Sequence, residues 1–225
     1  LSIIDLSSGK QPIYTEDKQK VILFNGEIYN FIALRKKLIT KGYTFHTNSD
    51  TEVVLYLYDC YGVEAFSMLD GMFALSIYDK TINKIFIARD FFGEKPLYYY
   101  HHNNDFIWAS ELKSIIEILP SNPTINKKSL NLYFQLTYIP APYTIYNNMH
   151  KLEPNKFITL DLSNFTYNIS EIPQKFMTYG QLSKSEAIQK TRQLVQNSVS
   201  LRSIADVPLG AFLSGGVDSS TIVAL

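Results

Sequence analysis

The stretch from Met72 to Asp90 reads MFALSIYDKTINKIFIARD, and it decides the fold. Two apolar runs, MFALSIYD and KIFIARD, are separated by only the four residues KTIN. A turn this short joins antiparallel neighbours, because parallel strands need a crossover connection of about a dozen residues or more. After the loop FFGEK, the runs PLYYYH and FIWAS repeat the pattern around the turn HNND. Residues 72–109 are therefore predicted to form antiparallel hairpins.

Further elements are expected on both sides of these hairpins, where apolar residues recur with the period of a strand or a helix. Strands are predicted at residues 21–24, 43–47 and 157–162. Helices are predicted at 30–41 with Asn30 as cap and Gly42 after the end, from Ser49 or Asp50 to 61, at 110–119 with Ser110 as cap, at 127–138, and at 183–203. In the last helix, Ser183 and Glu186 have the spacing of a capping box.

The composition points away from several classes of protein. The 225 residues contain 21 Lys and Arg against 21 Asp and Glu, so neither nucleic acid nor an anionic membrane is an expected partner. No apolar run of the sequence approaches the ~20 residues that span a bilayer. The single cysteine, Cys60, cannot form an internal disulfide, and this favours a cytoplasmic location. Cys60 is expected to be a small apolar residue of a helix. Because the first residues, LSIID, already resemble a strand, the chain is expected to be a fragment.

A glycine turn near the end of the chain carries the clearest chemical signal. The segment VPLGAFL (207–213) is predicted to be a strand, and a helix is predicted from Val217. Between and after them lie Ser214, Gly215, Gly216, Asp218, Ser219 and Ser220. Glycines let the backbone approach a ligand, and a helix N-terminus offers unpaired N–H groups and a partial positive charge, which suits a phosphate. The spacings of a Walker A loop, a dinucleotide fingerprint and a nucleophile elbow are absent, and an ordinary serine-capped turn remains an equal alternative.

The full string LSGGVDSS (213–220), from Leu213 to Ser220, resembles the pyrophosphate-binding loop of ATP-pyrophosphatase-type adenylating enzymes. Six further segments precede it in a fixed order: LSIID, NGEIYN, SDTEV, GMFALSIYD, ARDFFGEKPLYYY and ASELKSI. Together these motifs cover nearly the whole chain and resemble glutamine-hydrolysing asparagine synthetase. That resemblance implies a fold, a set of site residues and an activity.

The implied fold is an α+β four-layer α-β-β-α sandwich of the N-terminal-nucleophile hydrolase type, followed by the start of an α/β ATP-pyrophosphatase-type domain. The glutaminase domain would occupy residues 1–119 without its first residues. A connector would follow at 120–182, and residues 183–225 would open the synthetase domain. In the residues alone, the evidence for the first domain is the hairpin pattern of residues 72–109.

The resemblance also implies the roles of the glutaminase residues. Asn25 and Gly26 match an oxyanion hole, and the residues Leu1, Ser2, Ile3, Ile4, Asn25, Gly26, Glu27 and Asp50 match the glutamine site. The family's nucleophilic N-terminal cysteine and its carboxylate-binding arginine are not among these residues. From the sequence alone, Asn25-Gly26 has the alternative of a hairpin turn, and Asp50 that of a helix cap.

Two charged positions in the hairpin region have simpler interpretations. Arg89 and Asp90 are expected to have a structural role, as an ion pair at a strand end, and Lys95 to face the region between the domains. For Lys95 too, a structural role is the favoured interpretation.

The implied activity is glutamine-dependent asparagine synthesis with ATP and Mg²⁺. Glutamine yields ammonia, ATP adenylates aspartate, and ammonia displaces AMP. Leu213, Ser214, Gly215, Gly216, Asp218, Ser219 and Ser220 would bind ATP, Asp218 would assist Mg²⁺ placement, and the metal ligands are otherwise open. A homodimer is compatible with this interpretation, and the fragment itself is expected to be inactive.

Three alternatives remain at this point. The first is an amidotransferase of the same kind that acts on another carboxylate or on a sugar. The second is a non-catalytic binding module. The third is a transferase that uses phosphoribosyl pyrophosphate, against which LSGGVDSS argues, because such an acceptor domain needs no adenylating loop.

Overall fold

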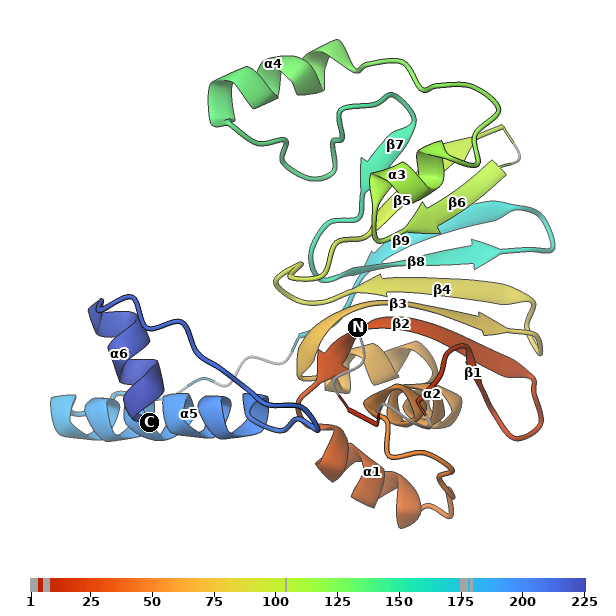
Figure 1. Cartoon of the computed structure of the whole chain (residues 1–225). Helices are drawn as coiled ribbons and strands as arrows, with labels where there is room; N and C mark the ends of the chain where they lie inside the picture. Colours follow the sequence, from red (N-terminus) through yellow and green to blue (C-terminus); the bar gives the residue numbers. More distant parts are fainter. Residues whose placement is uncertain (1–3, 6–8, 104, 175–177, 179) are drawn as a thin grey trace.

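The computed structural model describes residues 4–5, 9–103, 105–174, 178 and 180–225, and a pair of antiparallel sheets forms its centre (Figure 1). The larger sheet has six strands in the order β1-β2-β3-β4-β8-β9. These are β1 (Ile13–Tyr14), β2 (Lys20–Ile28), β3 (Gly71–Asp79), β4 (Lys84–Arg89), β8 (Lys156–Asp161) and β9 (Thr166–Glu171). The hairpin predicted at residues 72–90 is confirmed as β3 and β4. The Asp79 carboxylate closes its turn by accepting hydrogen bonds from the amide and hydroxyl of Thr81.

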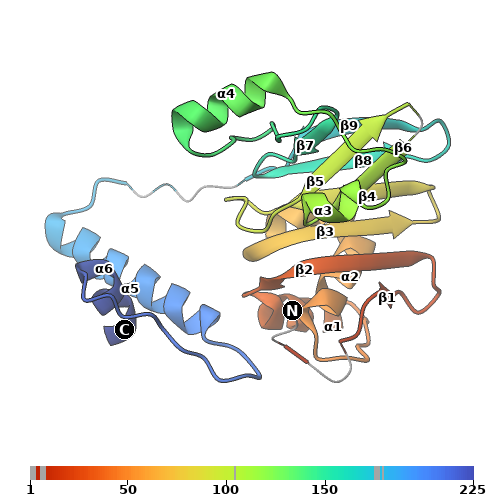
Figure 2. The ribbon, with the colours of Figure 1, turned by 45° about the horizontal axis from the view of Figure 1, so that its top comes forward.

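The smaller sheet contains β5 (Tyr98–His102), β6 (Asp105–Ala109) and β7 (Met149–Lys151) in the order β6-β5-β7. It lies over one face of the larger sheet (Figure 2). An apolar cluster fills the space between the sheets and consists of Ala74, Ile87, Leu97, Tyr99, Leu152 and Ile158. Residues 149–171, expected in a connector, thus supply strands to both sheets.

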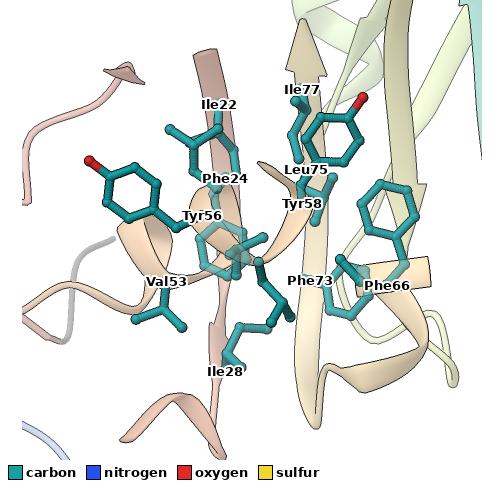
Figure 3. Packing of buried hydrophobic residues seen from close by; sticks show 14 of the residues in the cluster. Ile22, Phe24, Ile28, Val53, Tyr56, Tyr58, Phe66, Phe73, Leu75 and Ile77 are labelled. Carbon is teal, nitrogen blue, oxygen red and sulfur yellow. The ribbon is translucent and has the colours of Figure 1, made fainter. Parts of the chain in front are cut away.

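Helices α1 (Phe31–Ile39) and α2 (Asp50–Tyr61) cover the opposite face of the larger sheet, with the 3₁₀ helix η1 (Gly62–Met68) following α2. The main core lies between these helices and β2 and β3, and it includes Ile22, Phe24, Ile28, Val53 and Phe66 (Figure 3). Ser49 begins α2 as its N-cap and accepts a hydrogen bond from the Thr51 amide, as one of the two predicted caps. Asn30 has the predicted position before α1, but its side chain bonds to Met68 and Asp70 instead of capping the helix.

Helix α3 (Leu112–Ile116) lies against the smaller sheet on the side away from the larger one (Figure 1). This short helix packs against β5 and β6 of the smaller sheet, and α4 (Lys127–Leu136) extends to one side (Figure 1). Ser110 is not the cap of α3, because Glu111 takes that position without a side-chain cap bond. The Ser110 hydroxyl instead bonds to a side chain of β2, which is described with the candidate site.

The strand predicted at residues 43–47 is wrong. Its aromatic residues pack sideways on α2, since the Tyr43 and Phe45 rings both contact the Tyr56 ring. The amides of His46 and Thr47 donate to the Glu52 carboxylate, at 3.0 Å and 2.8 Å, in place of a neighbouring strand. Side-chain acceptors therefore satisfy this backbone and remove the need for a sheet partner.

The last part of the chain contains α5 (Lys184–Arg202) and α6 (Val217–Ala224), which lie beside the sheets (Figures 1 and 2). The capping box of Ser183 and Glu186 is present as predicted. The strand predicted at residues 207–213 does not form. A buried parallel strand depends on neighbours in its sheet, and the described residues after β9 contain no further strand that could pair with it.

β2 is longer than predicted and continues through Asn25, Gly26 and Glu27, paired with β3 over nine residues. The alternative of a hairpin turn at Asn25-Gly26 is therefore wrong. A Cβ atom on Gly26 would collide with the Met72 carbonyl oxygen, and one on Gly71 with the Glu27 carbonyl oxygen. Glycine at these two positions is what allows the two strands to pair so closely.

No helix in the described part of the chain is long and apolar enough to cross a membrane.

The close pairing of β2 and β3 predicts that Gly71→Ala strongly destabilises the protein. The new methyl group has no space against the backbone of β2, and we expect a loss of about 1–3 kcal/mol or more in the free energy of unfolding, measured by urea denaturation. Gly210→Ala is the matched control, because no atom lies within 4 Å of its added Cβ. Equal stability of the two variants would contradict the steric requirement for glycine at position 71.

Candidate active site

Asn25 lies on the part of β2 that faces the smaller sheet. Its side-chain Nδ2 donates to the Ser110 hydroxyl at 3.0 Å, across a sequence separation of 85 residues. Both residues line a cavity of about 250 Å³ between the sheets, together with Leu97, Trp108 and other residues of β2, β3 and β6. Ser110 was missed as a site residue, because its place before a helix made it resemble a cap.

Two buried carboxylates lie near the end of the same strand. Glu27 is 8% exposed and Asp50 5% exposed. The Asp50 carboxylate accepts a hydrogen bond from the Ile28 amide at 2.9 Å, which ties the start of α2 to β2. Asp50 is therefore not the helix cap, a position that Ser49 fills. The structure brings these two predicted residues together.

The electrostatics of this pair are unfavourable to two negative charges. Burial raises the pKa of Glu27 most, and the charge of Asp50 raises it further, while Lys95 and Arg202 oppose the rise. Burial also raises the pKa of Asp50, against the hydrogen bonds it accepts from backbone amides. Within the described residues, no hydrogen bond or ion pair to the Glu27 carboxylate is present. A bound cation that paired with both carboxylates would oppose the effects that raise their pKa values.

Asp5 contacts the turn that leads to this pair. The Asp5 carboxylate accepts a hydrogen bond from the Asn48 amide at 2.7 Å, in the turn that leads to Asp50. Ile4 is buried and belongs to the main core. The predicted site residues Leu1, Ser2 and Ile3 lie outside the described residues.

Arg89, the last residue of β4, and Asp90 fix the loop that contains Lys95, whose charge acts on Glu27. The buried Asp90 carboxylate accepts hydrogen bonds from the amides of Phe73, Phe92, Glu94 and Lys95. The Arg89 guanidinium donates to the carbonyls of Gly93, Lys95 and Leu152. Their structural role is confirmed, but through backbone bonds that fix the loop, and no ion pair joins the two side chains in the described structure.

The glycine turn before α6 is exposed to solvent. Gly215 has φ +81°, a backbone conformation that favours glycine, and Gly216 is the N-cap of α6. The hydroxyls of Ser214 and Ser219 lie 2.9 Å apart, and the Ser219 hydroxyl also donates to the Gly216 carbonyl. Asp218 lies in the first turn of α6, Ser220 follows Ser219 in that helix, and Leu213 precedes the turn. Anions therefore have free access to this helix N-terminus.

Neither cysteine nor metal chemistry is indicated elsewhere in the described residues. Cys60 packs against the main core from α2, which confirms its interpretation as a small helix residue. The described residues contain no group of three or more His, Cys, Asp or Glu side chains that could hold a metal ion.

Comparison with protein families matches two parts of the chain. Residues 1–171 match the family described as glutamine amidotransferase domain, and residues 190–225 match the family described as asparagine synthase. The second match begins within α5 and includes the glycine turn.

Curated proteins that resemble the chain have names of the same kind. Asparagine synthetase [glutamine-hydrolyzing] 1 of Bacillus subtilis is 41% identical over the whole chain, and asparagine synthetase [glutamine-hydrolyzing] 3 of the same organism is 32% identical. The chain covers 35% and 37% of these proteins, so it spans about a third of their length. The predicted resemblance is confirmed.

Among solved structures, the glutamine phosphoribosylpyrophosphate amidotransferase of Bacillus subtilis has a similar fold. Its TM-score is 0.52 at 15% identity, over 95% of this chain and 46% of that one. At this identity the likeness concerns the fold alone, and it confirms an amidotransferase fold with antiparallel sheets.

The raised pKa of Glu27 predicts a pH-dependent gain in stability for Glu27→Gln. A carboxyl group whose folded pKa exceeds its unfolded pKa stabilises the fold below the unfolded value, and this contribution is lost as pH rises through the folded value. At pH 7 an uncharged carboxamide at this position avoids that loss, so we expect Tm to rise by about 2–4 °C, the shift that ~1 kcal/mol produces in a chain of this size.

Calorimetry at pH 7 and near pH 4 tests this prediction, since the two proteins should converge at the lower pH. The exposed Glu117→Gln is the control and should leave Tm unchanged at both values. A lower Tm for Glu27→Gln at pH 7 would show that the Glu27 charge stabilises the fold.

Proposed function

This chain belongs to the glutamine amidotransferase family, and from that premise we propose that it binds glutamine near the end of β2 and the start of α2, and releases ammonia from it. Asn25 and Gly26 are the oxyanion donors, and Glu27 and Asp50 bind the α-ammonium group of glutamine. The observation that carries this proposal is the buried carboxylate pair, which lacks a cation of its own in the described structure. An α-ammonium group supplies the missing charge and can form charge-assisted hydrogen bonds with both acids.

Asn25 suits the oxyanion role because its carboxamide is held by a second residue. When a nucleophile attacks the glutamine amide carbon, the carbonyl oxygen becomes an anion that needs N–H donors. The amide nitrogen then leaves as ammonia. The hydrogen bond from Asn25 to Ser110 uses one N–H of the carboxamide and leaves the other for the oxyanion.

The second part of the proposed function is ATP-dependent synthesis of asparagine. The turn at Ser214, Gly215 and Gly216 and the hydroxyls of Ser219 and Ser220 suit the β- and γ-phosphates, because they combine hydroxyl donors with an accessible helix N-terminus. An aspartate carboxylate oxygen attacks the α-phosphorus, and pyrophosphate leaves. Ammonia then attacks the acyl carbon, and AMP leaves.

Mg²⁺ fits this site in a limited sense. Asp218 offers one carboxylate in the first turn of α6, and Mg²⁺ is often bound by one or two carboxylates together with substrate phosphates. When bound, the ion would neutralise charge on the phosphates. Aspartate as the acceptor is supported by the names of the relatives, and a sugar acceptor has no observation in its favour. A cytoplasmic location and a homodimer remain predictions.

The oxyanion role of Asn25 predicts a loss of glutamine hydrolysis in Asn25→Ala. In the full-length protein that contains this chain, we expect kcat to fall by ~10²–10³ and KM to change little, because the lost donor acts on the developing charge. Glutamate formation is the measurement, and synthesis with ammonium chloride in place of glutamine should persist. Asn197→Ala, on the exposed side of α5, is the control. Unchanged kcat would exclude Asn25 as a donor.

The phosphate role of the glycine turn predicts that Gly215→Val impairs adenylation. Valine at φ +81° costs about 1–3 kcal/mol in backbone strain, so we expect pyrophosphate release from ATP and aspartate to fall about tenfold or more. Glutamine hydrolysis should persist, which separates this effect from misfolding. Gly180→Val is the control, since it has open space and no positive φ. Undiminished pyrophosphate release would refute the assignment.

A further inference from the structure

The C-terminal end of α5 reaches the part of the fold that holds Glu27. The Arg202 guanidinium lies over the Tyr29 ring, 4.2 Å from its centroid. It also approaches the Asp70 carboxylate at 3.9 Å. The Asp70 carbonyl in turn accepts a hydrogen bond from the Tyr29 amide at 2.7 Å. Arg202 therefore contacts both Tyr29 and Asp70, which this backbone hydrogen bond joins. Tyr29 lies two residues after Glu27.

A second contact joins the same segment to the start of the chain. The Asp206 carboxylate accepts a hydrogen bond from the Asp5 amide at 2.8 Å, across 201 residues of sequence. The Asp5 carboxylate holds the Asn48 amide, in the turn that precedes Asp50. Between the two contacts, Ile204 packs against the main core. Asp206 thus acts on the side of the site that carries Asp50.

These contacts meet both walls of the glutamine site. One wall is the end of β2 with Glu27, and the other is the segment at Asp5 with the turn before Asp50. Both contacting side chains come from residues 190–225, the part that matches the asparagine synthase family. Moreover, the positive charge of Arg202 opposes the raised pKa of Glu27.

We propose that Arg202 and Asp206 are positioning residues of the glutamine site, contributed by the segment that opens the second domain. They hold the two walls at the separation that lets Glu27 and Asp50 share one ammonium group. Neither side chain needs to touch glutamine for this role. The inference rests on the proposed glutamine site, and it adds that this site is complete only when residues 202–206 are docked.

Single contacts of this kind are individually weak, and each corresponds to about a two- to fivefold change in an equilibrium constant. We therefore expect Arg202→Ala and Asp206→Ala each to raise the KM for glutamine about threefold, and the double variant about tenfold. The kcat for glutamate formation should change less than about twofold, since neither side chain acts on the reacting atoms. Arg202→Lys keeps the charge and should recover part of the loss.

The measurements use the full-length protein that contains this chain. Glutamate formation gives the KM and kcat for glutamine, and synthesis with ammonium chloride reports on the second domain alone. Arg192→Ala is the matched control, because it removes an exposed arginine from the same helix. A KM that does not change in the double variant would overturn the proposal. Equal loss of glutamine-dependent and ammonium-dependent synthesis would also overturn it, since a general structural defect would then explain the result.

Hydrogen exchange separates this proposal from the proposed function. The double variant should exchange the Asp5 and Tyr29 amides at least about fivefold faster than the wild type, because their positions lose an anchor. Unchanged exchange at both amides would contradict the positioning role even if glutamine is hydrolysed. A wild-type protein that does not hydrolyse glutamine would refute the proposed function, whereas the exchange rates would still decide whether residues 202–206 hold these segments.

Discussion

The close pairing of β2 with β3 is the constraint on which the rest of the structure depends. It requires glycine at positions 26 and 71, because a Cβ atom at either one would meet the backbone of the opposite strand. Continuous pairing makes side chains alternate between the two faces of the sheet. Ile22, Phe24 and Ile28 consequently enter the core under α1 and α2. Asn25 then faces the smaller sheet, where it meets Ser110. One strand thereby builds the core and presents the polar groups of the site.

The candidate site brings two buried carboxylates together, which is electrostatically unfavourable. Two acids with raised pKa values lie at the end of β2, and cations on other elements only partly oppose this shift. Lys95 reaches the region from a loop fixed by Asp90, and Arg202 from the far end of α5. Buried carboxylates are unfavourable unless they are paired, so two carboxylates without an ion-pair partner among the described residues suit binding better than stability. The same acids would reject a ligand that lacks a positive charge at that place.

The sequence predicted the local elements better than the long-range contacts. Residues 72–90 form a hairpin as expected, because a four-residue turn between apolar runs leaves few other arrangements. Residues 43–47 have a strand-like composition, yet the Glu52 carboxylate satisfies their amides, which no local pattern reveals. Motifs predicted Asn25, Glu27 and Asp50 as site residues. The contacts of Ser110, Arg202 and Asp206 became visible only in the structure, because they join residues that are 85 or more positions apart. The segment at 207–213 has the composition of a strand, but pairing also needs a neighbour, and composition does not supply one.

The Asp90 carboxylate has a consequence for how such chains can vary. This one side chain accepts hydrogen bonds from three amides of the following loop and from one amide of β3. These bonds fix the number of residues that the loop between 90 and 95 can contain. Adding or removing a single residue there would shift every later amide past its acceptor and would move Lys95 away from Glu27. Insertions and deletions in natural variants are therefore expected to accumulate in turns such as that between β8 and β9, and to spare this loop.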